Sequence, residues 1–308
     1  MDVLSDTLAA LRTGRPCSTL TRQQGHWEMG IPPFGGAGFH VVLDGSCRLI
    51  PRAPGEAVTL VKGDAVFLPH GTPHTLTASA DHPPTVLLTG GYRMDQARAH
   101  PLLADFPTFV PLSARATLHP SLHTVIRLLG DELESPGQGT DAALPSLLEL
   151  LLIHLMRAVY EARSTVATTG WCRALADPTT GAALRALHTE PARPWTVASL
   201  AATAGLSRAA FSRRFTTLVG RPPLTYVTWW RLTLAAGLLR NSDATLATVA
   251  ERVGYASQFA FANAFKREYG TSPGRYRLLA AGDDGLGGGY RAATAPLPVE
   301  PVSVLMPS

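Results

Sequence analysis

Residues 249–276 read VAERVGYASQFAFANAFKREYGTSPGRY, and residues 200–226 read LAATAGLSRAAFSRRFTTLVGRPPLTY. The second stretch repeats the landmarks of the first at an offset of 49 and then 50 positions. Repetition is the first feature to weigh in a sequence, and two copies are too few for a solenoid, so they predict two related helical units. The matched pairs are Ala201 and Ala250, Gly205 and Gly254, Phe211 and Phe261, Phe215 and Phe265, Gly220 and Gly270, Pro223 and Pro273, and Tyr226 and Tyr276.

Each copy has the layout of a helix-turn-helix. In the first copy, Thr196 is a plausible N-cap before apolar residues at helical spacing, and Gly205 is a plausible left-handed stop. Ser207 then caps a second helix that runs to about Val219. A turn of three residues between two helices is typical of DNA-binding helix-turn-helix units. A long helix over 224–239 would hold the two copies apart, with reading helices about 34 Å apart if both face one side of a duplex.

The second helix of each copy has one apolar face and one small, polar or cationic face. The aromatic pair at i and i+4 predicts the face that enters the core. The other face suits a major groove, because Arg pairs with guanine, Gln and Asn pair with adenine, and further cations meet phosphates. The predicted DNA-binding residues are Arg208, Ala209, Ser212 and Arg213 in the first copy, and Gln258, Phe259, Asn263, Lys266 and Arg267 in the second.

Charge divides the chain in the same place. Residues 178–279 contain 13 Lys and Arg against four Asp and Glu, a net charge of +9, whereas the rest of the chain carries −5. A basic module joined to an acidic one indicates a polyanionic partner for the basic part alone. Together with the two helix-turn-helix units, this charge predicts double-stranded DNA as a partner of the C-terminal module.

Residues 178–279 resemble the DNA-binding domain of the AraC/XylS transcription regulators. The resemblance rests on WTVASLAATAGLSRAAFSRRF, on the region from Arg231 to Leu239, and on VAERVGYASQFAFANAFKREYGTSPGRYR. It implies seven helices, two helix-turn-helix units and an asymmetric DNA site of about two major grooves. The base-reading positions of that family fall on Arg208, Ala209, Ser212 and Arg213 in the first copy and on Gln258, Phe259, Ala262 and Asn263 in the second.

The N-terminal part predicts a β-sandwich. Short apolar runs at 41–43, 47–50, 57–60, 65–68 and 86–88 are separated by Gly, Pro and Asp. The string GDAVFLPHGTPHTL, residues 63–76, resembles the second cupin motif at Gly63, Pro69, Gly71 and His74. FHVVLDG, residues 39–45, resembles the strand that closes the first cupin motif, but the preceding PPFGGAG carries no His-x-His pair and no Glu. The resemblance implies a jelly-roll sensor domain.

Two kinds of chemistry are open for this module. His40, His70 and His74 would hold a divalent metal if their imidazoles converge; otherwise His74 caps a turn and His40 is a packed strand residue. Cys17 is a candidate redox residue, alone or with Cys47, although similar sequences often have Cys-Gly where Thr89-Gly90 stands here. The alternative is that Cys17, Cys47 and Cys172 are ordinary thiols.

The predicted fold class is α+β multidomain, a jelly-roll followed by helices and then an all-α double helix-turn-helix domain. No run of eighteen apolar residues and no signal core stand in the sequence, which favours a cytoplasmic protein without a membrane partner. The helical region contains two apolar stripes, which predict either an interdomain core or a dimer seam, and the resemblance to the AraC/XylS family implies a homodimer. The predicted divisions are a sensor over 1–118, helices over 119–163, a linker over 164–178, the DNA-binding domain over 179–279 and a Gly/Pro-rich, disordered tail over 280–308.

The sequence as a whole predicts a one-component transcription regulator and not an enzyme. Its N-terminal domain would sense an unknown small molecule or a redox signal, and it would contact RNA polymerase if it is an activator. The first alternative is a metal-dependent cupin enzyme with an accessory DNA-binding domain, which the incomplete first cupin motif disfavours. The second is an architectural DNA-binding protein without a signal.

Overall fold

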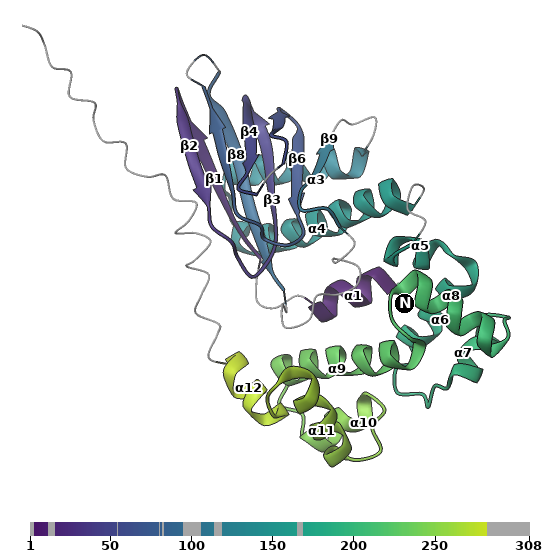
Figure 1. Cartoon of the computed structure of the whole chain (residues 1–308). Helices are drawn as coiled ribbons and strands as arrows, with labels where there is room; N and C mark the ends of the chain where they lie inside the picture. The colour runs from purple at the N-terminus through teal and green to yellow at the C-terminus, as the bar shows by residue number, and fades with distance from the viewer. Residues whose placement is uncertain are drawn as a thin grey trace, which may run out of the picture. The chain divides into compact units, whose positions relative to one another are not determined.

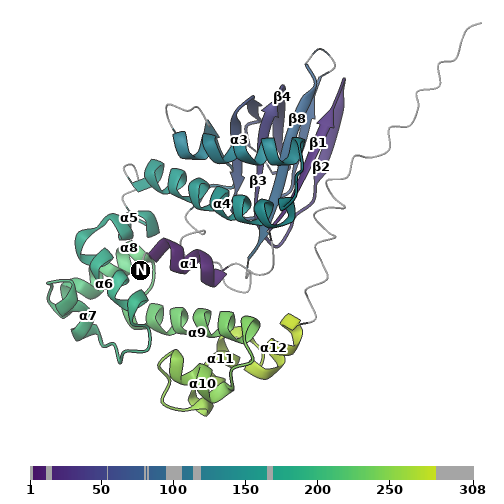
Figure 2. The same cartoon turned by 180° about the vertical axis from the view of Figure 1, so that it is seen from behind.

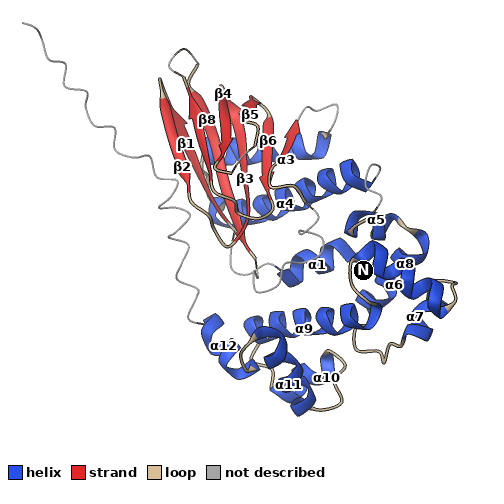
Figure 3. Ribbon diagram, viewed as in Figure 1, coloured by secondary structure: helices blue, strands red, loops and turns tan. Residues whose placement is uncertain are grey.

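The computed structural model describes residues 3–11, 16–53, 55–79, 81, 83–94, 106–113, 119–164 and 169–281. They form two compact units (Figure 1). A sandwich unit holds the described residues of 16–91 and 108–151, and a helical unit holds those of 1–15, 92–107 and 152–281. The strands are gathered in the sandwich unit, which also contains the helical residues 120–134 and 140–151 (Figure 3).

The sandwich unit contains two antiparallel sheets. The five-stranded sheet has the order β1 (Cys17–Gln23), β8 (Thr85–Arg93), β3 (Gly36–Asp44), β6 (Asp64–Leu68) and β9 (Val110–Ser113). The four-stranded sheet has the order β2 (Trp27–Ile31), β7 (His74–Ala78), β4 (Ser46–Pro51) and β5 (Val58–Val61).

The core of this unit lies between the two sheets. Alternate residues of each strand point inward, because successive side chains of a strand point to opposite faces. Their shared burial is what holds one sheet on the other, at roughly 25 cal/mol for each Å² of apolar surface removed from water. The buried members are Trp27, Met29, Ile31, Val42, Cys47, Leu49, Leu60, Val66, Leu68, Leu76, Ala78 and Leu87.

Five strands coincide with the predicted apolar runs, namely β3, β4, β5, β6 and β8. Four strands were not predicted: β1, β2, β7 and β9. The sequences of β1 (CSTLTRQ) and β7 (HTLTA) are rich in Thr and have few apolar residues, so an apolar-run criterion misses them. His74 consequently begins a strand and does not lie on a turn.

The predicted helical region of 119–163 is confirmed as two helices, α3 (Pro120–Glu134) and α4 (Thr140–Ser164). Helix α3 packs on the five-stranded sheet, where Gly130 lies against Leu43 (Figure 2). Helix α4 is long and apolar enough to cross a membrane, a property that core helices of soluble proteins share. Its residues Leu151, Leu155 and Val159 are fully buried in the protein, and the absence of a membrane partner stays a prediction.

The helical unit supplies the seven helices that the resemblance implies for residues 178 onwards. They are α6 (Pro178–Thr189), α7 (Val197–Thr203), α8 (Arg208–Val219), α9 (Pro223–Asn241), α10 (Leu246–Arg252), α11 (Gln258–Tyr269) and α12 (Pro273–Ala281). Helix α9 packs against both α8 and α11, as expected for a long helix that joins the two copies.

The sequence repeat is a repeat of turn geometry. Gly205 and Gly254 both take left-handed φ values, of 66° and 80°. In both turns the next residue donates its N–H five positions back, Leu206 to Ala201 and Tyr255 to Ala250. The following helices α8 and α11 are capped in the same way, because the hydroxyls of Ser207 and Ser257 accept from the N–H three residues on, and both helices end at a left-handed glycine.

Two segments belong to different units than the predicted divisions suggest. The linker over 164–178 contains helix α5 (Trp171–Ala176), whose Trp171 and Ala174 are fully buried and which packs on α6 and α8. Helix α1 (Val3–Leu11), expected within the sensor, packs on α6 and α9, and Arg240 of α9 donates to the carbonyl of Ala10 at 3.2 Å. Beyond residue 281 the predicted tail lies outside the described residues.

Gly71 of the second cupin motif gives a test of the sandwich. Its φ is +56°, and a Cβ built on it would lie 2.1 Å from the backbone carbonyl oxygen of Phe34. Gly63 of the same motif also has a positive φ, +85°, but a Cβ there meets nothing within 4 Å. Substituting Gly63 therefore tests the left-handed backbone alone, whereas substituting Gly71 tests the left-handed backbone and the close approach of Phe34 together.

We predict that Gly63→Ala lowers the stability of the sandwich unit by about 1–2 kcal/mol, the cost of a left-handed non-glycine residue. Gly71→Ala should cost about 1–3 kcal/mol more, because the added methyl group meets backbone that must shift. Urea denaturation of the full-length variants, followed by far-UV circular dichroism, measures both. Equal losses in the two variants would contradict the close approach of Phe34.

Candidate functional site

Helix α8 has the two-faced character that the sequence predicts. Phe211 and Phe215 are fully buried, with ring centroids 5.4 Å apart, and Phe215 also meets Tyr226 of α9 at 5.8 Å. Because these anchors fix the rotation of the helix, the opposite side chains are held at the surface. Arg208, Ala209 and Arg213 are exposed, and Ser212 is partly exposed.

Helix α11 repeats this arrangement with different chemistry on its surface. Phe261 and Phe265 are fully buried, 5.6 Å apart between centroids, and Phe265 stacks on Tyr269 at 4.3 Å. The predicted contact residues of this helix are all exposed: Gln258, Phe259, Asn263, Lys266 and Arg267. Ala262 is partly exposed on the same helix.

Phe259 is the unusual member of this surface. Its side chain is 73% exposed, although a phenylalanine gains about 1.5–3 kcal/mol from full burial. It stands next to Gln258 at the start of the helix, on the part of a reading helix that approaches base edges in helix-turn-helix proteins. An exposed aromatic ring there is suited to an apolar contact with a thymine methyl group.

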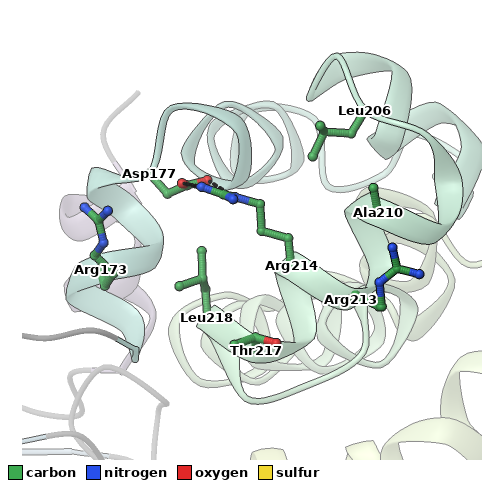
Figure 4. Close-up of a pocket in the computed structure, with 8 residues that line it drawn as sticks. All are labelled: Arg173, Asp177, Leu206, Ala210, Arg213, Arg214, Thr217 and Leu218. Atoms are coloured by element: carbon green, nitrogen blue, oxygen red, sulfur yellow. Dashed lines mark hydrogen bonds and ion pairs between the residues drawn. The ribbon is translucent and has the colours of Figure 1, made fainter.

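An ion pair that the sequence did not predict joins α8 to the N-terminus of α6. Asp177 caps α6 by accepting from the N–H of Thr180 at 2.8 Å, and its side chain is 1% exposed. The Arg214 guanidinium of α8 donates to both oxygens of this carboxylate, through Nε at 3.2 Å to each and through Nη2 (Figure 4). These contacts, of which the hydrogen bonds from Arg214 have the largest effect, hold the pKa of the Asp177 carboxyl well below its usual range. The sequence Asp177–Pro178 could have revealed the start of α6, because Asp is a common N-cap and Pro is common at the first helical position.

In the sandwich unit, the structure brings two of the three predicted metal ligands together. His40 of β3 and His74 of β7 come from different sheets, and their Nε2 atoms are 2.7 Å apart. Both side chains are buried. The other ring nitrogens also have partners, Thr89 Oγ1 at 2.8 Å from His40 Nδ1 and the Thr72 carbonyl at 2.8 Å from His74 Nδ1.

The partners determine the tautomer of each ring. A carbonyl only accepts, so Nδ1 of His74 donates to Thr72 and Nε2 of neutral His74 accepts. His40 then donates from Nε2, and its Nδ1 accepts from the hydroxyl of Thr89. Every polar atom of the pair is satisfied with both rings neutral. Burial lowers the pKa of both imidazoles, for His40 with a further contribution from His74, so the neutral state is the one expected at pH 7.

The pair does not fit a three-histidine metal centre. His70 is exposed while His40 and His74 are buried, so the three imidazoles do not converge as predicted. The described residues hold no group of three or more His, Cys, Asp or Glu side chains placed to bind a metal ion.

The cysteines lie on separate elements. Cys17 is partly buried on β1, and its thiol donates to the Gly91 carbonyl at 3.6 Å. Cys47 is on β4 of the other sheet, where burial raises the pKa of its thiol to about 12. A thiol that stays protonated is a poor nucleophile, so Cys47 is unsuited to redox chemistry with Cys17. Cys172 is buried on α5. A redox role for Cys17 stays a prediction.

Two family models match the chain, one over its N-terminal part and one over its C-terminal part. Residues 2–161 match the family model described as a cupin, and residues 200–278 match the model described as a helix-turn-helix domain. A putative AraC-like transcription regulator of Streptomyces lividans is 34% identical over 299 residues, covering 90% of this chain and 98% of that protein. Another from Streptomyces antibioticus is 31% identical with the same coverage.

Among solved structures, the DNA-binding domain of AdpA in complex with a target DNA is 36% identical over 34% of this chain and 95% of that one, with a TM-score of 0.33. The two full-length relatives and the two family models cover both units of the chain. This chain belongs to the family of AraC-like transcription regulators, as a DNA-binding protein with a cupin-like N-terminal domain and a helix-turn-helix C-terminal domain.

Proposed function

We propose that the chain reads promoter DNA with α8 and α11 in two major grooves. The observation that carries this proposal is the matched exposure of both helices, each anchored by a buried aromatic pair on its other side. The predicted base contacts are Arg208, Ala209, Ser212 and Arg213 on α8, and Gln258, Phe259 and Asn263 on α11; Lys266 and Arg267 would meet phosphates. Footprinting on fragments from the genomic neighbourhood tests it, with two protected grooves about one helical turn apart as the expected result.

The sandwich unit is proposed to receive the signal. A change in its packing, or in a homodimer formed through the helices that follow the sheets, would alter which half-sites the reading helices occupy. A small-molecule effector and oxidation of Cys17 are the two candidate signals. The protein is proposed to act in the cytoplasm without enzymatic activity, and to contact RNA polymerase if it activates transcription.

The rival function is a metal-dependent cupin enzyme with an accessory DNA-binding domain. The hydrogen-bonded His40–His74 pair speaks against it, because both Nε2 atoms are already engaged with each other. The purified full-length protein should therefore carry metal well below one ion per chain, as measured by mass spectrometry of the native protein. Stoichiometric iron or manganese, together with product formation in a turnover screen, would establish the rival.

Arg208 provides the sharpest test of base reading. Arg208→Ala should weaken binding to the cognate site by about 1–3 kcal/mol, because a guanidinium that pairs with guanine discriminates by that amount. Binding to random DNA should change far less. Titrations with both DNAs at the same salt concentration measure the difference. An equal loss on both would show that Arg208 contacts only phosphate.

Phe259 provides an independent test on the second reading helix. If its ring packs on a thymine methyl group, replacing that thymine with deoxyuridine should weaken wild-type binding about fourfold, the equivalent of roughly 0.8 kcal/mol for one buried carbon group. Phe259→Ala should bind both DNAs equally. The measurement is a double-mutant cycle over every thymine of the footprint of α11. A wild-type protein insensitive to all of these replacements would refute the methyl contact.

A further inference from the structure

We propose that an arginine-lined pocket between α5 and α8 is a seat for a phosphate group of the DNA backbone, with Arg173 as its contact. The inference rests on the proposed function and extends the DNA surface beyond the two reading helices. The pocket has a volume of about 510 Å³. Its apolar wall consists of Leu206, Ala210 and Leu218, and its polar wall contains three arginines and one carboxylate (Figure 4).

The charge of the pocket is positive after internal pairing. The carboxylate of Asp177 is engaged by Arg214 through two nitrogens, so it is not available to the other cations. Within the part of the chain that the structure describes, neither Arg173 nor Arg213 donates a side-chain hydrogen bond or forms an ion pair. Two guanidinium groups that have no acceptor among the described residues favour an anion, and Arg is the residue best suited to phosphate oxygens.

The position of the pocket identifies the anion. Arg213 belongs to the exposed face of α8, and Arg173 lies across the pocket on α5, with the Asp177–Arg214 pair between them (Figure 4). Phosphates line both edges of a major groove, which is about 12 Å wide. When the exposed face of α8 enters the groove, an element packed beside α8 faces the flanking backbone. Helix α5 packs on α8, as α6, α7 and α9 also do, and of these four neighbours it is the one that contributes an arginine, Arg173, to the lining of the pocket.

The structure also explains why Arg173 is held in place. Trp171 and Cys172, its neighbours on α5, are buried, and the Arg173 carbonyl accepts from the N–H of Asp177 at 2.9 Å. The same Asp177 anchors α8 through Arg214. Arg173 and α8 are therefore both tied to Asp177, the first through the backbone N–H of Asp177 and the second through its carboxylate, so Arg173 is held beside α8.

The test is the salt dependence of DNA binding by Arg173→Gln in the full-length protein. Losing one phosphate contact makes the negative slope of log affinity against log salt shallower by about 0.9. The ratio of wild-type to variant affinity should therefore shrink about 3.5-fold between 50 and 200 mM salt. Cognate and random DNA should be affected by the same factor. Arg173→Lys should keep the slope, because the charge remains.

The matched control is Arg127→Gln, which removes one exposed arginine of α3 in the sandwich unit. It should leave slope and affinity unchanged, and thermal unfolding of all variants shows whether they fold. An unchanged slope in Arg173→Gln, or an equal change in the control, would overturn the pocket assignment. A larger loss on cognate than on random DNA would also overturn it, because Arg173 would then act by positioning α8. A wild-type protein without sequence-specific binding would instead overturn the proposed function itself.

Discussion

The DNA-binding surface depends on the burial of an aromatic pair one helical turn apart in each reading helix. Phe211 with Phe215, and Phe261 with Phe265, remove one face of α8 and of α11 from water. A helix locked in this way has no freedom to rotate, so the identity of its exposed residues follows from the positions of its buried ones. The turns reinforce the lock, since Gly205 and Gly254 provide the same left-handed conformation at the same place in each copy.

This constraint explains which helices could be predicted from the sequence and which could not. The aromatic spacing, the glycine stops and the serine caps are local signals, and they predicted α8 and α11 together with the exposure of their contact residues. Helix α5 was concealed because only six residues form it, and because its stability comes from the burial of Trp171 against other helices and not from its own sequence pattern. Strands β1 and β7 escaped for a similar reason, since their neighbours, and not their apolar content, place them in the sheets.

The histidine pair shows a second limit of reasoning from residue types. His40, His70 and His74 suggested a metal centre by composition, but whether imidazoles bind a metal or one another depends on where the third ring points. Antiparallel pairing places His40 opposite Val66, and His74 opposite Ile31 on one side and Pro51 on the other. This arrangement turns both rings into the space between the sheets and leaves His70 outside. The neutral, fully bonded pair then joins the two sheets at a point where an unpaired imidazole would be costly.

The two reading helices share a scaffold but differ in chemistry, and that difference bears on how the protein uses its duplication. Helix α8 exposes guanidinium groups beside small residues, whereas α11 exposes two amides and a phenyl ring. If these residues contact bases as proposed, the first set favours guanine and the second adenine and thymine, so one chain would specify an asymmetric sequence over two grooves. A second chain would then not be needed to read a complete site. A homodimer would instead raise the effective concentration of the second chain at a DNA site next to the one that the first chain occupies. A signal in the sandwich unit could then act by changing the geometry of the dimer.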